Sequence, residues 1–487
     1  MRAFLRRGDF TVILRAMRPK EFMNVAVRHI LTKKGDVVFL SEEEQIQRFY
    51  GRLTFITNRM QRFNIRFSLL DYFYLMETAR AGGYVSMAER IWNTIAGDTH
   101  LPYRRGPDTY ITNSYMAARA GTGRTDRLVR TSSRTVELRR QSDRDPLQQT
   151  RLIIDNMKRK GIPPNSMTWE LMILAAARMG ELPVIEAVLQ KVWHVNCSEL
   201  ILADVKGEEV PVVLERESES EKKLDRGHPL YPSEITLFNI AVALGTIGQV
   251  PLAFRLVDYM SRRFEITVPR PAWIALLNWT YTWLHTRSYP GRKFLAPNAV
   301  ENVWNTLLSE PYNIEPTIEM YDLVIRSYLH RGMPDAAEYN MDRALSLIVP
   351  IVEKRNAAEA ELAALEAQHP EVHKRTSEVQ RVISKKSQRL AKAMRDLEIA
   401  RAIARRWVEI LVIGNDMQQM PYFAWKRVPD IIDKWSYFLG DEVVYFTSTG
   451  YVDLSLGEDK RWVPIMLRKR RAKKPIGSGS KEEDDLF

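Results

Sequence analysis

One stretch, Met157 to Leu189, constrains the fold of this chain more than any other. It reads MKRKGIPPNSMTWELMILAAARMGELPVIEAVL. Gly161 is expected to end one helix, because glycine tolerates the left-handed conformation just past a helix C-terminus, and Pro163 with Pro164 prevents that helix from continuing. Gly180 interrupts the pattern a second time. The stretch therefore predicts helices separated by tight turns, that is, a helical hairpin.

The helix between these breaks has a start signal and a helical periodicity. Ser166 or Thr168 can cap its N-terminus with a side-chain oxygen. Apolar residues then recur at the spacing of one helix face, namely Trp169, Met172, Ile173 and Ala176. We expect this face to be buried against a neighbouring helix.

Similar punctuation recurs along the chain, and such recurrence indicates a repeat protein. The related stretches run from Leu69 to Ile95, from Ile235 to Met260 and from Ile314 to Ala344. At these residues the chain resembles the pentatricopeptide-repeat family, whose unit is two antiparallel helices. Residues 157–165, followed by Thr168 and Trp169, are close to the family consensus, whereas the other copies are degenerate.

The resemblance covers residues 69–344 and implies an all-α fold. We expect a right-handed superhelical solenoid of antiparallel helix pairs, followed by a long helical hairpin and a small C-terminal segment. A tetratricopeptide-like repeat or another helical-pair repeat is the alternative. The predicted parts are a basic, leader-like region (1–40), the solenoid (41–345) with insertions at about 121–150 and 198–232, a coiled-coil-like hairpin (346–414), a segment with a helix and two strands (415–465), and a basic then acidic tail (466–487).

Charge and cysteine content narrow the classes of function. The 487 residues contain 72 Lys and Arg against 60 Asp and Glu, a net charge of +12, which favours an anionic partner such as RNA or an acidic membrane surface. The alternative is a ribosomal or mitochondrial protein that is basic but does not bind RNA directly. A single cysteine, Cys197, excludes an internal disulfide and any zinc site built on cysteine pairs. No apolar run reaches the ~18 residues of a membrane span.

The N-terminus, MRAFLRRGDFTVILRAMRPK, alternates arginine with apolar residues and contains one acid, Asp9. An arginine-rich, acid-poor amphipathic start is typical of a mitochondrial leader. An ordinary basic first helix is the alternative. With the leader interpretation, we expect the protein in the mitochondrial matrix.

The resemblance implies how RNA would be read. In this family, a side chain near the start of each first helix and another at the end of the repeat hydrogen-bond one unstacked base. The corresponding first-helix positions here are Phe73, Asn113, Glu170, Phe238, Ile274 and Asp322. Asn113 with Asn165 is the best predicted pair. The other positions depart from the family's usual Asn, Ser or Thr, so a base-by-base code is in doubt.

Basic clusters are the predicted phosphate contacts. They comprise Arg130, Arg134, Arg139 and Arg140, then Lys158, Arg159 and Lys160, and a stripe with Arg381, Lys385 and Arg389. A solvated helix face is the alternative for each cluster.

Enzyme motifs are missing from the sequence. It has no phosphate-cradling loop and predicts no catalytic residue and no cofactor. His369 and His373 have the spacing of metal ligands on a helix, but Pro370 lies between them, so we predict no metal site.

We therefore expect a mitochondrial protein that binds single-stranded RNA, mRNA or rRNA, and acts in mRNA maturation, stability or translation. The alternative is a structural subunit or assembly factor of the mitochondrial ribosome or of a respiratory complex. In that case residues 346–414 would contact other proteins.

Overall fold

The structure is a computed structural model. It describes residues 7–16, 29–31, 37–39, 42–63, 65–82, 85–97, 108–119, 145–206, 224–285, 295–310, 312–369, 377–413, 423–439, 442–447 and 450–455. The chain divides into two compact units, unit 1 (Met1–Phe294) and unit 2 (Leu295–Phe487), and each is described by itself.

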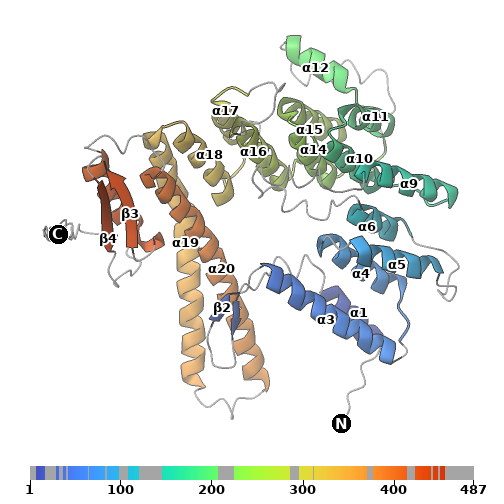
Figure 1. The fold of residues 1–487 in the computed structure, drawn as a ribbon, viewed down its shortest axis with the longest axis horizontal. Coiled ribbons are helices and arrows are strands. Elements are labelled where there is room, and N and C mark those ends of the chain that lie inside the picture. Colours follow the sequence, from blue (N-terminus) through green and yellow to red (C-terminus); the bar gives the residue numbers. More distant parts are fainter. Residues whose placement is uncertain are drawn as a thin grey trace, which may run out of the picture. The chain divides into compact units, whose positions relative to one another are not determined.

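Unit 1 is built mainly of helices (Figure 1). They are α1 (Arg7–Ala16), α3 (Glu42–Arg62), α4 (Leu69–Gly82), α5 (Val85–Gly97), α6 (Thr109–Arg119), α9 (Pro146–Arg159), α10 (Ser166–Met179), α11 (Leu182–Trp193), α12 (Cys197–Lys206), α14 (Glu234–Thr246), α15 (Val250–Phe264) and α16 (Arg270–His285). Two short strands, β1 (His29–Leu31) and β2 (Val37–Phe39), form an antiparallel pair.

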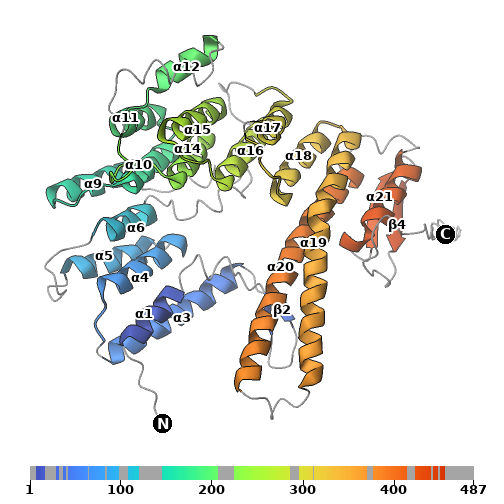
Figure 2. The ribbon, with the colours of Figure 1, turned by 180° about the vertical axis from the view of Figure 1, so that it is seen from behind.

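The helices of unit 1 form two kinds of contact. The first helices of the repeats, α4, α6, α10, α14 and α16, each pack against the next one in this order. Each of the first four also packs against its own second helix, which is α5, α9, α11 or α15. Figure 2 shows the pairs following one another from α4 to α16. The predicted all-α fold of stacked helical pairs is confirmed.

Two of the first helices, α10 and α14, begin at N-termini with a capping box. In α10 the cap is Asn165, whose side chain accepts from the backbone N–H of Thr168, while the Thr168 hydroxyl accepts from the backbone N–H of Asn165. The sequence predicts Ser166 or Thr168 as the cap, which is wrong, because the cap is Asn165 and Thr168 is the third residue of the box. Ser233 and Thr236 form the same box in α14. Each box supplies partners for backbone groups that a helix start leaves free.

The turns of this repeat match the glycine pattern. Gly161 and Gly180 have φ angles of 66° and 78°, in the left-handed region where a side chain would be strained. The α10 interior is buried from Leu171 to Ala177, so both faces of this helix are covered. Trp169 is half-buried rather than buried.

Glycine at position 245 permits close packing of two first helices, α14 and α16. A Cβ atom at this position would overlap the indole ring of Trp279. The indole N–H of Trp283 donates to the Gly245 carbonyl over 2.5 Å. The two helices can therefore approach each other only without a side chain at position 245.

The second predicted insertion, 198–232, is partly described. It begins in α12, which packs against α11 and α15. Its last residues fold back onto unit 1, where the Trp193 indole donates to the Leu230 carbonyl (2.8 Å) and the Tyr231 hydroxyl donates to the Phe264 carbonyl (2.5 Å). Most of the first predicted insertion, residues 121–144, lies outside the described residues.

Unit 2 contains α17 (Ala299–Leu308), α18 (Ile318–His330) and a long antiparallel hairpin. The hairpin consists of α19 (Pro334–Gln368) and α20 (Ser377–Ile413), which pack against each other. Because α19 is continuous, the domain boundary predicted near residue 345 falls inside a helix. A π-helical turn, η5 (Phe423–Arg427), α21 (Val428–Trp435), a 3-10 turn, η6 (Ser436–Phe438), and the antiparallel strands β3 (Glu442–Thr447) and β4 (Gly450–Ser455) follow.

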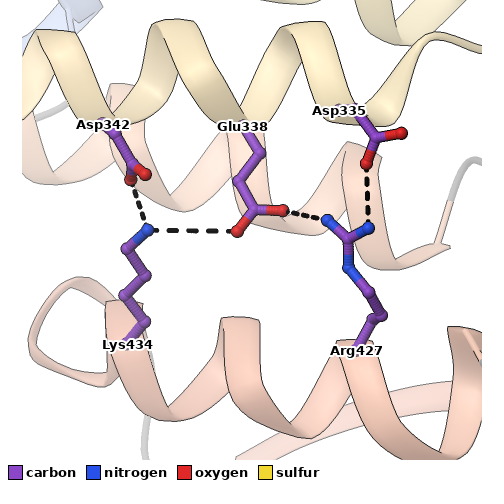
Figure 3. A network of polar contacts seen from close by, with 5 residues as sticks. All are labelled: Asp335, Glu338, Asp342, Arg427 and Lys434. Carbon is purple, nitrogen blue, oxygen red and sulfur yellow. Dashed lines mark hydrogen bonds and ion pairs between the residues drawn. The ribbon is translucent and has the colours of Figure 1, made fainter.

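Charged side chains hold the parts of unit 2 together. Asp322 of α18 is buried and accepts from the Trp407 indole of α20 (2.9 Å) and from Arg406 (3.3 Å). On the other side of the hairpin, Arg427 and Lys434 form ion pairs with carboxylates of α19 (Figure 3). The α19 carboxylates are Asp335, Glu338 and Asp342. The second network attaches α21 to the hairpin.

Gly245→Ala should destabilise unit 1, since the new methyl group would displace Trp279 from a close-packed helix contact. We expect a loss of about 1–3 kcal/mol in the free energy of unfolding, as for other overpacked cores. Gly51→Ala is the matched control, because nothing lies within 4 Å of its added Cβ in helix α3; it should be neutral or stabilising by up to about 1 kcal/mol. Thermal melting followed by circular dichroism measures both, and equal melting temperatures would contradict the α14–α16 packing.

Candidate nucleic-acid interface

The structure brings the predicted base-reading pair together. Asn113 is the fifth residue of α6, and its Nδ2 donates to Oδ1 of Asn165 over 2.8 Å. Asn113 Oδ1 accepts from the Thr168 hydroxyl over 2.9 Å. Asn113 is 0% exposed and Asn165 is half-buried. In this arrangement the two side chains bind each other and the start of the next first helix, so Asn113 presents no free amide at the surface.

The next first helix repeats this arrangement with a carboxylate. Glu170 is the fifth residue of α10; Oε1 accepts from the Thr236 hydroxyl (2.5 Å) and Oε2 from Nδ2 of Asn239 (2.8 Å). Thr236 occupies the same place in its capping box as Thr168 does one repeat earlier. The fifth side chain of one first helix therefore binds the capping box of the next.

Burial raises the pKa of Glu170 above its ordinary value, and the hydrogen bonds from Thr236 and Asn239 act in the opposite direction. Removal of a carboxylate from water disfavours its charged form. Glu170 is 2% exposed, so desolvation has the larger effect.

The other fifth positions do not present base-reading groups either. Phe73, Phe238 and Ile274 are half-buried and apolar. Asp322, in unit 2, is hydrogen-bonded to Trp407. The polar fifth residues, Asn113, Glu170 and Asp322, are thus used in helix-to-helix contacts.

Sequence reasoning missed a different set of positions, the second residues of the first helices. Leu70, Tyr110 and Ile235 are 49%, 64% and 61% exposed, and Met167 between them is half-buried. Each stands just before a residue of the helix start that is buried. Such a position can be recognised in the sequence as an apolar residue within the capping motif of a helix, where its side chain is not expected to be buried.

The second residues of α6, α10 and α14 share one edge of unit 1. The contact of Asn113 with Thr168 and that of Glu170 with Thr236 each join two helix starts, so the N-termini of α6, α10 and α14 lie side by side. Single exposed apolar residues are common on protein surfaces, but here they recur at one position of successive repeats. We call Leu70, Tyr110, Met167 and Ile235 the apolar row.

The predicted phosphate contacts fall in both units. Lys158 and Arg159 end α9, Lys160 follows them, and all three are exposed. Lys158 lies 3.7 Å from Asp155. The cluster of Arg130, Arg134, Arg139 and Arg140 lies outside the described residues.

The stripe on α20 is accessible but partly paired. Lys385 and Arg389 are exposed, and Arg389 lies 3.6 Å from Glu361 of α19. Lys386 donates to the same carboxylate over 2.5 Å and, as the main cause, lowers the pKa of Glu361. The Arg381 side chain is not described.

The described residues contain no group of three or more possible metal ligands, and none of their helices is long and apolar enough to cross a membrane. His373 lies outside them. Burial raises the pKa of the Cys197 thiol to about 12, which keeps it protonated, as for a small core residue.

Glu170→Gln should change how stability depends on pH. Because the folded-state pKa of Glu170 is raised, the folded protein retains a proton over a range in which the unfolded chain has lost it, and stability then falls as pH rises. The glutamine has no such titration, so the variant should gain stability relative to wild type from about pH 4.5 upwards. Urea unfolding at several pH values measures this difference, with Glu186→Gln as a partly exposed control on α11; parallel pH profiles would contradict a buried, titrating Glu170.

Three comparisons with known proteins bear on this geometry. The family described as "ATP13: Mitochondrial ATPase expression" matches residues 166–294. "Pentatricopeptide repeat-containing protein 6, mitochondrial" of Schizosaccharomyces pombe is 25% identical over 334 residues, which are 67% of this chain and 64% of that protein. The match thus spans less than two thirds of the relative.

Solved structures of similar proteins are more distant. The crystal structure of PPR10 from maize has a TM-score of 0.27 at 14% identity, over 89% of this chain and 54% of that one. PPR10 in complex with an 18-nt psaJ RNA element has a TM-score of 0.30 at 14% identity, over 82% of this chain and 55% of that one. With the repeated helix pairs of unit 1, the fission-yeast relative confirms that this chain resembles the pentatricopeptide-repeat proteins.

Proposed function

We propose that the protein binds single-stranded RNA in mitochondria and acts in the maturation, stability or translation of an organellar mRNA. The apolar row is the observation that carries this proposal. Unpaired bases stack on aromatic side chains such as Tyr110, their faces also pack against other exposed apolar side chains, and some RNA-binding repeat proteins bind one base per repeat. A row that repeats once per first helix offers one such contact in each repeat.

Net charge and the basic cluster of α9 support the same partner. A strand lying along the helix starts carries one phosphate per nucleotide, and the exposed residues Lys158, Arg159 and Lys160 offer compensating charges within unit 1. We assign a secondary contribution to Arg130, Arg134, Arg139 and Arg140, and to Arg381, Lys385 and Arg389 of α20. Base preference should be weak, because Asn113 and Glu170 are bound within the fold.

A mitochondrial location agrees with three observations. The fission-yeast relative and the matching family are both described as mitochondrial. The arginine-rich N-terminus is typical of an import signal. On the same three observations we propose that the protein binds its RNA in the mitochondrial matrix.

A scaffold role in the mitochondrial ribosome, or in assembly of a respiratory complex, is the second candidate. The side chains that would read bases hold helices together, and the α19–α20 hairpin is long enough to contact another protein. Crosslinking and sequencing of the RNA bound in mitochondria separates the two. A discrete mRNA supports the first proposal, whereas ribosomal RNA recovered with ribosomal proteins supports the second.

Tyr110→Ala should weaken binding of a single-stranded transcript. Loss of one aromatic residue that stacks on a base costs about 1–3 kcal/mol, and Tyr110 is 64% exposed, so the fold should be unaffected. Leu152→Ala is the control, since Leu152 is an exposed apolar residue on a second helix, α9. Fluorescence anisotropy with a labelled transcript measures both affinities. Equal affinities for the two variants would exclude the apolar row as the RNA surface.

Removal of basic charge should flatten the salt dependence of binding. Replacement of Lys158, Arg159 and Lys160 by Gln should reduce the log–log slope by about 0.7 for each lost phosphate contact on a single strand. The same change at Lys385, Arg389 and Lys392 is the matched comparison in unit 2. A larger effect of the second variant would move the main RNA surface to α20, and wild-type protein without RNA affinity at low salt would refute RNA binding.

A further inference from the structure

The N-terminal helix α1 belongs to the part of the sequence that predicts a leader, yet it is packed into unit 1. Its apolar residues Phe10 and Leu14 are 2% and 1% exposed. The helix contacts α4, the first helix of the first pair, and also α3. A leader that is removed after import does not need a buried face in the folded protein.

A specific hydrogen bond adds to this packing. The Thr11 hydroxyl donates to Oδ1 of Asp71 in α4 over 2.7 Å. Asp71 is 0% exposed, and its other oxygen accepts from the backbone N–H and the hydroxyl of Ser68 (2.8 and 2.6 Å). Because a buried carboxylate needs donors at both oxygens, Thr11 completes the environment of a group that belongs to the capping box of α4.

We infer that α1 remains in the mature protein and caps the first repeat of unit 1, in addition to any role in import. The end helices of a repeat protein have an uncovered face, and repeat proteins close it with a capping element. Helix α1 covers α4 with its apolar face, while Val12 and Arg15 stay exposed. One apolar face cannot bind a targeting receptor while it is buried in the core. Any recognition of α1 by an import receptor must therefore occur before the chain folds.

The capping function does not depend on RNA binding, and it can be tested on the purified full chain. Leu14→Asp should lower the melting temperature by several degrees and speed hydrogen exchange of the α4 amides. Val12→Asp is the matched control, since it adds the same charge to the same helix at a side chain that is 64% exposed; it should melt like wild type. Thr11→Val, which replaces the hydroxyl by a methyl group of similar size, should lower the melting temperature by a smaller amount.

If Leu14→Asp fails to fold, a variant that lacks residues 1–16 tests the same contact between α1 and α4. We expect the shortened chain to melt earlier than wild type, with faster exchange in α4. A deletion variant with wild-type melting and exchange, or equal melting of Leu14→Asp and Val12→Asp, would overturn the inference.

The state of the N-terminus in cells completes the test. The protein would be purified from mitochondria through a C-terminal tag and its N-terminal peptide identified by mass spectrometry. We expect a mature chain that still contains Phe10 to Leu14. A mature N-terminus beyond Ala16 would show that α1 is removed, and would overturn retention even if RNA binding is confirmed.

Discussion

The hydrogen bonds between successive helix starts are the contacts on which the rest of unit 1 depends. Asn113 binds Thr168 of the next first helix, and Glu170 binds Thr236 of the one after. Both acceptors are buried, so an unmade bond would leave a desolvated polar group, which is costly. The geometry of a threonine in a capping box therefore sets how one repeat is placed on the next.

This constraint also decides which residues remain available for a ligand. A polar side chain that holds two helices together cannot at the same time present its hydrogen-bonding groups to a base. The second residues of the first helices are instead exposed or half-buried, so their side chains remain available for a ligand. Recognition by the proposed RNA surface would then rest on stacking and on phosphate charge, which tolerate many sequences.

Unit 2 uses buried and exposed charge for a comparable purpose. Asp322 is held by Trp407 and Arg406 in the interior, whereas Arg427 and Lys434 attach α21 to α19 through ion pairs that are partly exposed to water. Exposed pairs contribute little to stability individually, whereas several charges joined in one network contribute more. At the other end of the chain, the Thr11–Asp71 hydrogen bond plays a similar part for α1.

The sequence alone predicted the helical repeats, a helical hairpin at residues 346–414 and the two C-terminal strands, because glycine and proline breaks and helical periodicity are local signals. It did not predict that the first helix of this hairpin begins at Pro334. It also placed Asn113 beside Asn165 through the family resemblance. Only the tertiary structure decided what these residues do. Whether an asparagine reads a base or binds a neighbouring residue depends on its burial. Burial likewise decides whether Phe10 and Leu14, in a helix that resembles a leader, belong to the core. Burial is set by contacts between residues that lie far apart in the chain, and local patterns do not encode them.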